Sequence, residues 1–383
     1  MKITLEGSTN NIKTKEEALA IGRDGGRVCY SELDFGRIKA EPNKQDLVDK
    51  LLAIKHHSPF DHPQLMFYFT QTPKIIFMIL NNERVYTTSE KSARFTQMRL
   101  QGLQKELYDK WIDLFKVRIQ NQYPGMSSEK TEKLAQENSR YLTSVFTPGK
   151  MLHTLSFRQL NHIMHFFEEF IVIAPDNDFN FRIKELMKEF NGIMEPWYVG
   201  ELIKVDRYLN LFAKRNNFQE EFGESYSTNY RISFACLAQA HRHRTLNYQM
   251  QPLVAPIAEG TEFNYFIPPI IKNEQALVEE WLNDLEKVAD DYSQGTLLDV
   301  NERGMFEDFV SKIYERLCGH AQLEIVNQTK KTLDAYLRAT VLSHPHLHQE
   351  LKKYTKGPRC TFPDYKCSQR CEFGSRQGIE RLV

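Results

Sequence analysis

The chain has 383 residues, of which 41% are hydrophobic and 26% are charged. This balance is typical of a globular protein, and the length allows two domains, each with its own core. The 50 Lys and Arg residues are balanced by 50 Asp and Glu residues. A general nucleic-acid-binding protein normally carries a basic bias, so we expect no nucleic-acid partner.

The sequence contains no apolar run long enough to cross a membrane, so we expect no membrane partner. The first residues, MKITLEGSTNNIKTKEEALAIG, also lack the apolar core of a signal peptide. Six cysteines without a secretory signal favour a reducing compartment. We therefore expect a cytoplasmic protein.

The first half of the chain is predicted to begin with a strand at 2–5, followed by mixed helix with an amphipathic segment at 47–54. Aromatic residues occur at strand spacing in 65–71. The segment 74–82 is apolar throughout, which predicts burial, whether as helix or as strand. Three longer amphipathic helices are then predicted, at 101–123, 127–146 and 157–173.

The pattern of the second half resembles this order. An apolar segment at 231–244 ends in a basic turn, as 74–84 does. A short strand is predicted at 263–269 and a long amphipathic helix at 274–292, which matches 101–123. A long helical stretch is predicted at 304–342. Because helical proteins often show such coincidences, the pattern alone leaves open whether the chain is duplicated.

We predict an α+β fold of two similar domains, each a small, mostly antiparallel sheet flanked by long helices. The predicted domains are residues 1–195 and 196–343. Residues 344–383 form an appended tail that contains Cys and His.

A basic segment, Gln239-Ala240-His241-Arg242-His243-Arg244, carries the first candidate chemistry. Gln239 and Arg242 are three positions apart and would share one face of a helix. Arginine is the planar, bidentate ligand for phosphate or for the imide edge of a uracil. The alternative is a surface basic cluster at a helix C-terminus, where the helix dipole favours cations.

A second polar segment precedes the first long helix and contains Glu90, Ser92 and Arg94. A hydroxyl, backbone N–H groups and an arginine within three residues can surround a phosphate. The alternative is a solvated turn that caps a helix.

Together these segments resemble the flavin-dependent thymidylate synthases, which carry R-H-R, a variable stretch and then S-x-R in one continuous motif. The second half of this chain has Arg242-His243-Arg244 without the serine and final arginine, whereas the first half has Asn82-Glu83-Arg84 followed by Glu90, Ser92 and Arg94. Three further family segments match, at His56 to His62 (H-x-[ST]-P-[FV]-E-H), at Arg140, and at Arg316 to Ile325 (R-x-x-x-H-A-Q-x-E-I).

The two halves depart from the family pattern in a complementary way. In the family, one subunit supplies R-H-R, the preceding Gln and the late Arg, and another supplies the Glu-x-Ser-x-Arg loop and the middle Arg. The second half of this chain keeps the first set and the first half keeps the second set. The resemblance therefore implies composite sites between domain 1 and domain 2, in a homodimer that acts as a pseudo-tetramer.

By this resemblance the reaction is reductive methylation of dUMP to dTMP, with FAD as cofactor and NADPH and methylenetetrahydrofolate as co-substrates. Arg316 would be catalytic and polarise the uracil. The implied substrate-binding residues are Gln239, Arg242, Glu90, Ser92, Arg94 and Arg140. The implied cofactor-binding residues are His56, Ser58, Arg242, His243, Arg244, Glu90 and Arg158. The first domain has Arg158 at a flavin position where the second has Glu307.

Two other functions stay open at this point. One is a related flavin enzyme that places a different one-carbon group, such as hydroxymethyl, on a pyrimidine nucleotide. The other is a catalytically inactive homologue that binds nucleotide only.

The tail contains Cys360, Cys367 and Cys371, with His344, His346 and His348 just upstream. Three thiols can hold zinc if a His or a fourth Cys completes a tetrahedron. The spacing is not that of a usual zinc motif, so free thiols in a docked tail are the alternative. Cys29, Cys236 and Cys318 lie in apolar contexts and are expected in the core.

Overall fold

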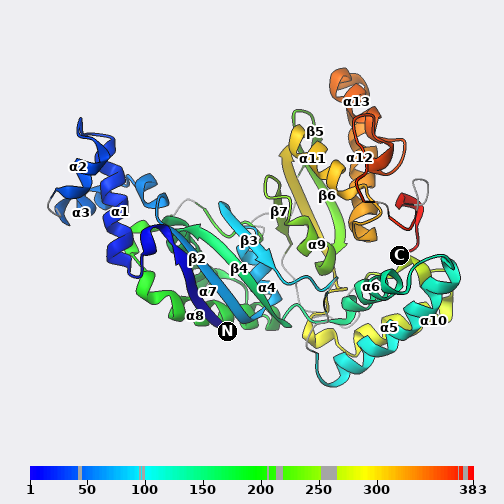
Figure 1. Ribbon diagram of the computed structural model, residues 1–383. Coiled ribbons are helices and arrows are strands. Elements are labelled where there is room, and N and C mark those ends of the chain that lie inside the picture. The colour runs from blue at the N-terminus through cyan, green and yellow to red at the C-terminus, as the bar shows by residue number, and fades with distance from the viewer. Residues whose placement is uncertain are drawn as a thin grey trace. The chain divides into compact units, whose positions relative to one another are not determined.

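Figure 1 shows the chain as a computed structural model. The structure describes residues 1–41, 45–94, 96, 100–204, 207–212, 219–251, 265–369, 371–373 and 378–383. Within these residues the chain forms two four-stranded antiparallel sheets flanked by helices. The predicted α+β class is therefore confirmed.

The chain folds into two compact units, each made of two stretches of sequence. Residues 1–91 and 148–210 form the first unit, and residues 92–147 and 211–383 form the second. The predicted domain boundaries follow the repeat in the sequence and remain a prediction. The contacts group the chain differently, because residues 92–147 pack with the second unit.

The sheet of the first unit has the strand order β1-β2-β4-β3. Its strands are β1 (Lys2–Ser8), β2 (Gln64–Pro73), β4 (Pro148–Ser156) and β3 (Tyr86–Glu90). Along β2, Leu65, Phe67 and Phe69 are buried at alternate positions, because successive side chains of a strand point to opposite faces. The strands predicted at 2–5 and 65–71 are confirmed.

In the first unit, one helix directly follows strand β2 and another directly follows strand β4. The helices are α1 (Lys15–Val28), α2 (Phe35–Ala40), α3 (Gln45–Ala53), α4 (Lys74–Leu80), α7 (Phe157–Ile173) and α8 (Asp178–Met194), with 3-10 turns η1 (Thr9–Asn11), η2 (Ser58–Asp61), η4 (Glu195–Trp197) and η5 (Gly200–Leu202). Ser156 caps α7 by accepting a hydrogen bond from the Gln159 N–H at 3.0 Å. The apolar run at 74–82 is thus a short buried helix.

The sheet of the second unit has the order β5-β6-β8-β7. Its strands are β5 (Glu221–Phe222), β6 (Ser225–Ser233), β8 (Leu297–Met305) and β7 (Asn247–Met250). Helices α9 (Phe234–Ala240), α11 (Phe306–Arg316), α12 (Leu323–Ser343) and α13 (Pro345–Leu351) belong with this sheet, and 3-10 turns η8 (Lys352–Tyr354) and η9 (Arg359–Thr361) follow in the tail.

A helical layer completes the second unit. It contains α5 (Gly102–Gln122), α6 (Ser128–Ser139) and α10 (Gln275–Glu286), with 3-10 turns η3 (Arg140–Leu142), η6 (Pro269–Ile271) and η7 (Ala289–Asp291). Trp111 and Trp281 are fully buried in its core, with ring centroids 4.8 Å apart in an edge-on arrangement. Asp284 accepts the Trp111 indole N–H at 2.9 Å, so the buried donor is satisfied.

The two halves of the chain share one connectivity, which supports the proposed duplication. Both sheets have the same order of strands, and in both a long strand runs directly into a short helix (β2 into α4, β6 into α9). The strands β4 and β8 likewise run directly into α7 and α11. Ser144 and Ser293, which precede β4 and β8 by the same number of positions, face each other in an antiparallel bridge.

Three predicted segments end differently from the expectation. The stretch predicted as one helical segment at 304–342 contains the end of strand β8 followed by the two helices α11 and α12. A turn between Arg316 and Leu323 separates these helices. The helix predicted at 127–146 ends at Ser139, and the one at 274–292 ends at Glu286. In the strand predicted at 263–269, Tyr265 forms an isolated bridge with Thr296, and residues 263 and 264 lie outside the described residues.

None of the described helices combines the length and apolar character needed to cross a membrane.

Candidate functional site

The Arg-His-Arg segment lies in the second unit, on the turn that follows α9. Ser233 begins this helix by accepting a hydrogen bond from the Cys236 N–H at 3.1 Å. Gln239 lies in its last turn. His243 is buried, Arg242 is half-buried and Arg244 is exposed.

The late arginine reaches this turn from the end of α11. The Nε of Arg316 donates to Nε2 of His243 at 2.6 Å. Burial, together with the charge of Arg316, lowers the pKa of His243 to about 2. The imidazole is therefore neutral, accepts through Nε2 and carries its proton on Nδ1. This contact places the Arg316 guanidinium beside a neutral partner, and the carboxylate of Glu315, 3.6 Å from Arg316 Nη2, compensates part of its charge.

Gln239 joins residues from both predicted sets. The side-chain amide is oriented so that both its oxygen and its nitrogen have hydrogen-bond partners. Its Oε1 accepts from Arg94 Nη1 at 3.2 Å and from Arg316 Nη1 at 3.1 Å. Its Nε2 donates to Gln322 Oε1 at 2.9 Å. Arg94 precedes the first long helix and Arg316 ends α11, so two arginines far apart in sequence meet at one amide oxygen.

Arg140 and Glu137 lie in the same region of the second unit. Arg94 forms an ion pair with Glu137 and donates to the His320 carbonyl at 2.7 Å. Arg140 is 6% exposed and donates to the Ala235 carbonyl at 3.5 Å. Burial alone would raise the pKa of Glu137, but the charges of Arg94 and Arg140 outweigh it and hold that pKa below its usual value.

Guanidinium groups thus outnumber ionised carboxylates among these buried residues. Burial lowers the pKa values of Arg140 and Arg316, because a cation loses hydration in the interior. An anion placed among them would recover part of that lost solvation. The arrangement is suited to a phosphate or to a uracil-like edge.

The sequence reasoning missed Glu137, although a signal was present. Glu137 and Arg140 are three positions apart, which places them on one face at the end of α6. Tyr141, Gln322 and Glu324 were also missed as contributors, and they link the segments that carry the arginines. Ser92 accepts a hydrogen bond from the Arg94 N–H at 3.3 Å, so it orders the backbone beside that arginine.

Glu90, His56, Ser58 and Arg158 lie in the first unit. The Glu90 carboxylate is almost fully buried, where it forms an ion pair with Lys74 and accepts from the Asn81 amide at 3.1 Å. The His56 ring packs edge-on against Tyr30, and Ser58 begins the η2 turn.

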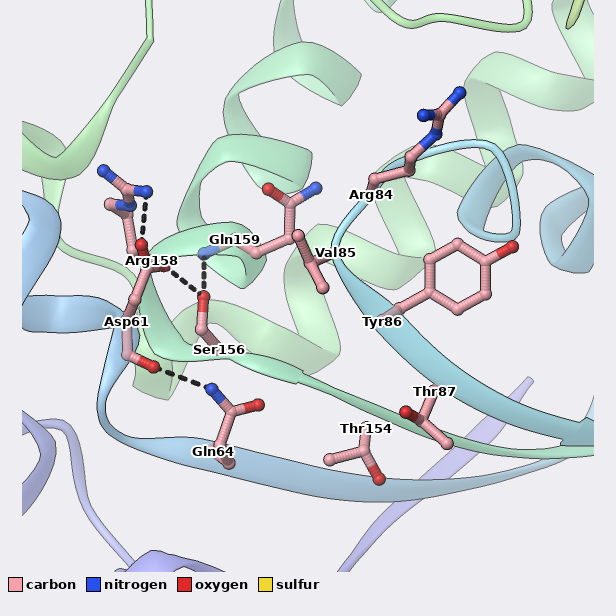
Figure 2. A pocket seen from close by; sticks show the side chains of 10 residues that line it. All are labelled: Asp61, Gln64, Arg84, Val85, Tyr86, Thr87, Thr154, Ser156, Arg158 and Gln159. Carbon is pink, nitrogen blue, oxygen red and sulfur yellow. Dashed lines mark hydrogen bonds and ion pairs between the residues drawn. The ribbon is translucent and has the colours of Figure 1, made fainter. Parts of the chain in front are cut away.

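A pocket in the first unit contains Arg158 (Figure 2). Its volume is about 340 Å³. The lining residues are Asp61, Gln64, Arg84, Val85, Tyr86, Thr87, Thr154, Ser156, Arg158 and Gln159. Arg158 forms an ion pair with Asp61, whose other oxygen accepts from Ser156 Oγ at 2.7 Å. The lining is mixed polar and apolar and includes two arginines, but His56 and Ser58 are not part of it.

The first unit has no copy of the arginine cluster at the corresponding positions. By the matching of β2–α4 with β6–α9, Glu83 corresponds to His243. By the matching of α7 with α11, Phe167 corresponds to Arg316. Glu83 is fully buried and accepts from Arg207 Nη2 at 2.5 Å and from the Asn210 N–H at 2.6 Å. Burial raises its pKa to about 7.

The tail cysteines lie beside the turn that follows Arg316. The Arg359 N–H donates to the Leu317 carbonyl at 2.6 Å, which brings Cys360 near this turn. A Cβ at Gly319 would lie 2.6 Å from Cys371 Sγ, so the thiol packs directly on that glycine. Cys367 donates to the Gln369 carbonyl at 3.1 Å. Among the described residues, no three His, Cys, Asp or Glu side chains are arranged to hold a metal ion.

Fold and site together define an α+β protein with a buried, arginine-rich region in its second unit and a pocket that contains two arginines in its first. Residues 13–171 match the model of the family described as "Thymidylate synthase complementing protein". The resemblance predicted from the motifs is thus confirmed over that segment. The matched segment includes Glu90, Arg94 and Arg140 and ends before the Arg-His-Arg segment.

Solved structures match part of the chain at low identity and with low TM-scores. The chain is 14% identical to a UMP/dUMP methylase, PolB from Streptomyces cacaoi, bound with 5-Br dUMP, with a TM-score of 0.34 over 51% of this chain and 90% of that one. It is 13% identical to the flavin-dependent thymidylate synthase ThyX from Helicobacter pylori complexed with FAD and dUMP, with a TM-score of 0.32 over 53% and 100% of the two chains. No curated protein matches the chain.

The neutral His243 predicts a specific dependence of stability on pH. Its pKa is about 2 in the folded state and about 6.5 in an unfolded chain. As the pH falls below about 6.5, the unfolded state therefore takes up a proton that the folded state does not, and the free energy of unfolding decreases by up to about 1.4 kcal/mol per pH unit. Urea unfolding of the wild type and of His243→Gln, from pH 7 to pH 4.5, should show a shallower decline for the variant. Equal declines would contradict the assignment.

Proposed function

We propose that this protein is a flavin-dependent enzyme that methylates C5 of dUMP to give dTMP. The observation that carries the proposal is the meeting of Arg94 and Arg316 at Gln239, beside the buried pair of Glu137 and Arg140. Gln239 and the three arginines come from the two sets that the motif resemblance divides between the halves of the chain. In this structure the members of both sets, with the exception of Glu90, lie within the second unit of one chain.

The chemistry of dUMP fits this arrangement. Its phosphate is a dianion, and its uracil presents a planar edge of acceptors that guanidinium groups can bind in pairs. We assign the phosphate to Arg94, Arg140 and Arg242, with Ser92 as a hydroxyl donor. We assign the uracil to Arg316 and Gln239. A positive charge fixed at the ring edge stabilises negative charge that develops on the ring during C5 alkylation.

The cofactor assignment rests on the pocket of the first unit. Arg84 and Arg158 there could meet an anionic pyrophosphate, although Asp61 already compensates part of the charge of Arg158. When bound, FAD would supply the redox chemistry, taking a hydride from NADPH, while methylenetetrahydrofolate gives the carbon. The other proposed flavin contacts are His56, Ser58, Glu90, His243 and Arg244. We also propose a cytoplasmic homodimer that acts as a pseudo-tetramer.

The reaction is tested with purified protein, FAD, NADPH, dUMP and methylenetetrahydrofolate. A flavin absorbance spectrum should be present or should appear on addition of FAD, and NADPH should bleach it. Mass spectrometry of the product should show dTMP. A hydroxymethylated product would assign a different one-carbon transfer, and a protein that binds dUMP but no flavin would be an inactive homologue.

Replacing Arg316 separates catalysis from binding. Arg316→Ala should lower kcat by a factor on the order of 10² to 10³, as for the loss of one donor that stabilises transition-state charge, while dUMP affinity falls much less. Arg231→Ala is the matched control, because Arg231 is a half-exposed arginine of the same unit that pairs with Asp299 on the sheet. An unchanged kcat in Arg316→Ala, with only a raised KM, would refute the catalytic role.

We further propose that the tail binds zinc, with the buried Cys318 as fourth ligand beside Cys360, Cys367 and Cys371. The support is that Leu317 and Gly319, on either side of Cys318, contact the segments that carry Cys360 and Cys371. Zinc binding would require the tail to close further onto this turn, because the described side chains do not form a complete ligand set.

Metal analysis of purified protein should find about one zinc per chain. Cys367→Ser should lose the metal and lower the thermal midpoint, because the binding energy of a structural metal adds directly to folding stability. Cys29 is exposed and not in the core as predicted, because the end of α1 leaves it at the surface, whereas Cys236 and Cys318 are buried. Cys29→Ser, which changes this thiol of the first unit, should keep both the metal and the thermal midpoint. A metal-free wild type of unchanged stability would mean that the tail carries plain thiols.

A further inference from the structure

A buried carboxylate, Glu324, connects the segments that carry the proposed nucleotide ligands. It lies in the first turn of α12 and is 6% exposed. One oxygen accepts from the Ser233 N–H at 2.7 Å, and the other accepts from Ser233 Oγ at 2.6 Å and from the Tyr141 hydroxyl at 3.0 Å. Gln322 Nε2 approaches the second oxygen at 3.4 Å.

The partners of Glu324 are the residues that position the arginines. Ser233 is the N-cap of α9, the short helix that carries Gln239 and leads into the Arg-His-Arg turn. Tyr141 directly follows Arg140 on the η3 turn. A second path runs from the Tyr141 hydroxyl through Gln322, whose amide donates to that hydroxyl at 2.6 Å and accepts from Gln239 at 2.9 Å.

The segments joined in this way are far apart in the sequence. Residue 141 follows α6, residue 233 ends β6, and residues 322 and 324 begin α12. Gln239 in turn accepts hydrogen bonds from Arg94 and Arg316. All of these residues belong to the second unit. One carboxylate therefore bonds directly to the segments of Arg140 and of α9, and it is linked to Arg94 and Arg316 through Tyr141, Gln322 and Gln239.

Stability alone is a poor reason for a carboxylate at this place. Removing a carboxylate from water is costly, and replacing buried charged groups with well-packed apolar residues is often neutral or stabilising. Burial raises the pKa of Glu324, and its hydrogen bonds to Ser233 and Tyr141 oppose that rise. A fully hydrogen-bonded carboxylate instead orders its surroundings, because its two oxygens fix the positions of the N–H and O–H groups that donate to it.

We infer that Glu324 is a positioning residue of the nucleotide site: it sets Arg140 and the α9 turn in register, so that Arg94 and Arg316 meet at Gln239. This inference rests on the proposed function. Catalytic groups must be held within about 0.5 Å of the productive geometry by such supporting contacts. At metal sites, the loss of such a supporting partner typically lowers metal affinity or activity by about 10- to 100-fold, and we expect a loss of the same order here.

Glu324→Gln is the test, because it keeps the size of the side chain and removes the charge and one acceptor. We expect a fall in kcat/KM of about 10- to 100-fold, from misplacement of the arginines. Tyr141→Phe removes one bond of the same network and should lower kcat/KM in the same direction. The double variant should lose less than the product of the two single losses, because both changes break one network.

Asp284→Asn is the matched control. Asp284 is also a carboxylate of the second unit, 1% exposed, and accepts from an aromatic residue, the Trp111 indole, but lies in the helical core. It should lower the thermal midpoint and leave KM and kcat near wild type. If Glu324→Gln fails to fold, the milder Tyr141→Phe carries the comparison.

Calorimetric titration with dUMP distinguishes the two ways in which the inference can fail. A wild-type protein that binds no dUMP would overturn the proposed function itself. A wild-type protein that binds dUMP, with Glu324→Gln and Tyr141→Phe both binding and turning over like Asp284→Asn, would overturn the positioning role alone.

Discussion

The structure of the second unit depends on how its residues compensate the positive charge of guanidinium groups that are buried away from water. Arg94 pairs with Glu137, whose pKa Arg140 also lowers, whereas Arg316 contacts the neutral His243 and lies 3.6 Å from the more exposed carboxylate of Glu315. Burying three guanidinium groups is costly, and a bound anion would recover part of that cost. The surrounding hydrogen bonds hold these groups in place before any ligand binds, so a nucleotide phosphate would find its donors already ordered.

The proposed duplication explains why this charge arrangement occurs in one unit. A chain with two copies of a domain can keep one set of ligands in each copy, provided that the two sets still meet. In the first unit the position of His243 is taken by Glu83, which holds Arg207 and Asn210, and the position of Arg316 is taken by Phe167. Glu83 pairs with Arg207 where the second unit has the neutral His243, and Phe167 is apolar where the second unit has Arg316, so the first unit avoids the cost of a buried arginine at that position.

Much of this could be predicted from the sequence, where the signal is local. Alternating aromatic residues gave the strand at 65–71, and apolar periodicity gave the long helices. The motif split between the halves placed Gln239 and Arg94 in two sets expected to share a site, but it did not predict their contact. Tyr141 and Glu324 could not be assigned in this way, because their roles come from contacts between segments far apart in the chain. Glu137 could have been assigned from its three-residue spacing to Arg140. The turn between Arg316 and Leu323 was missed because the apolar pattern continues across it.

The central claim is that the two sets of ligands form one nucleotide site per chain. Isothermal titration calorimetry of the purified protein with dUMP, at a known chain concentration, measures the number of sites per chain directly. The account predicts saturation at one dUMP per chain, since the first unit has Glu83 and Phe167 where the second has His243 and Arg316. Saturation at two dUMP per chain would mean that each half holds its own site and would contradict the account.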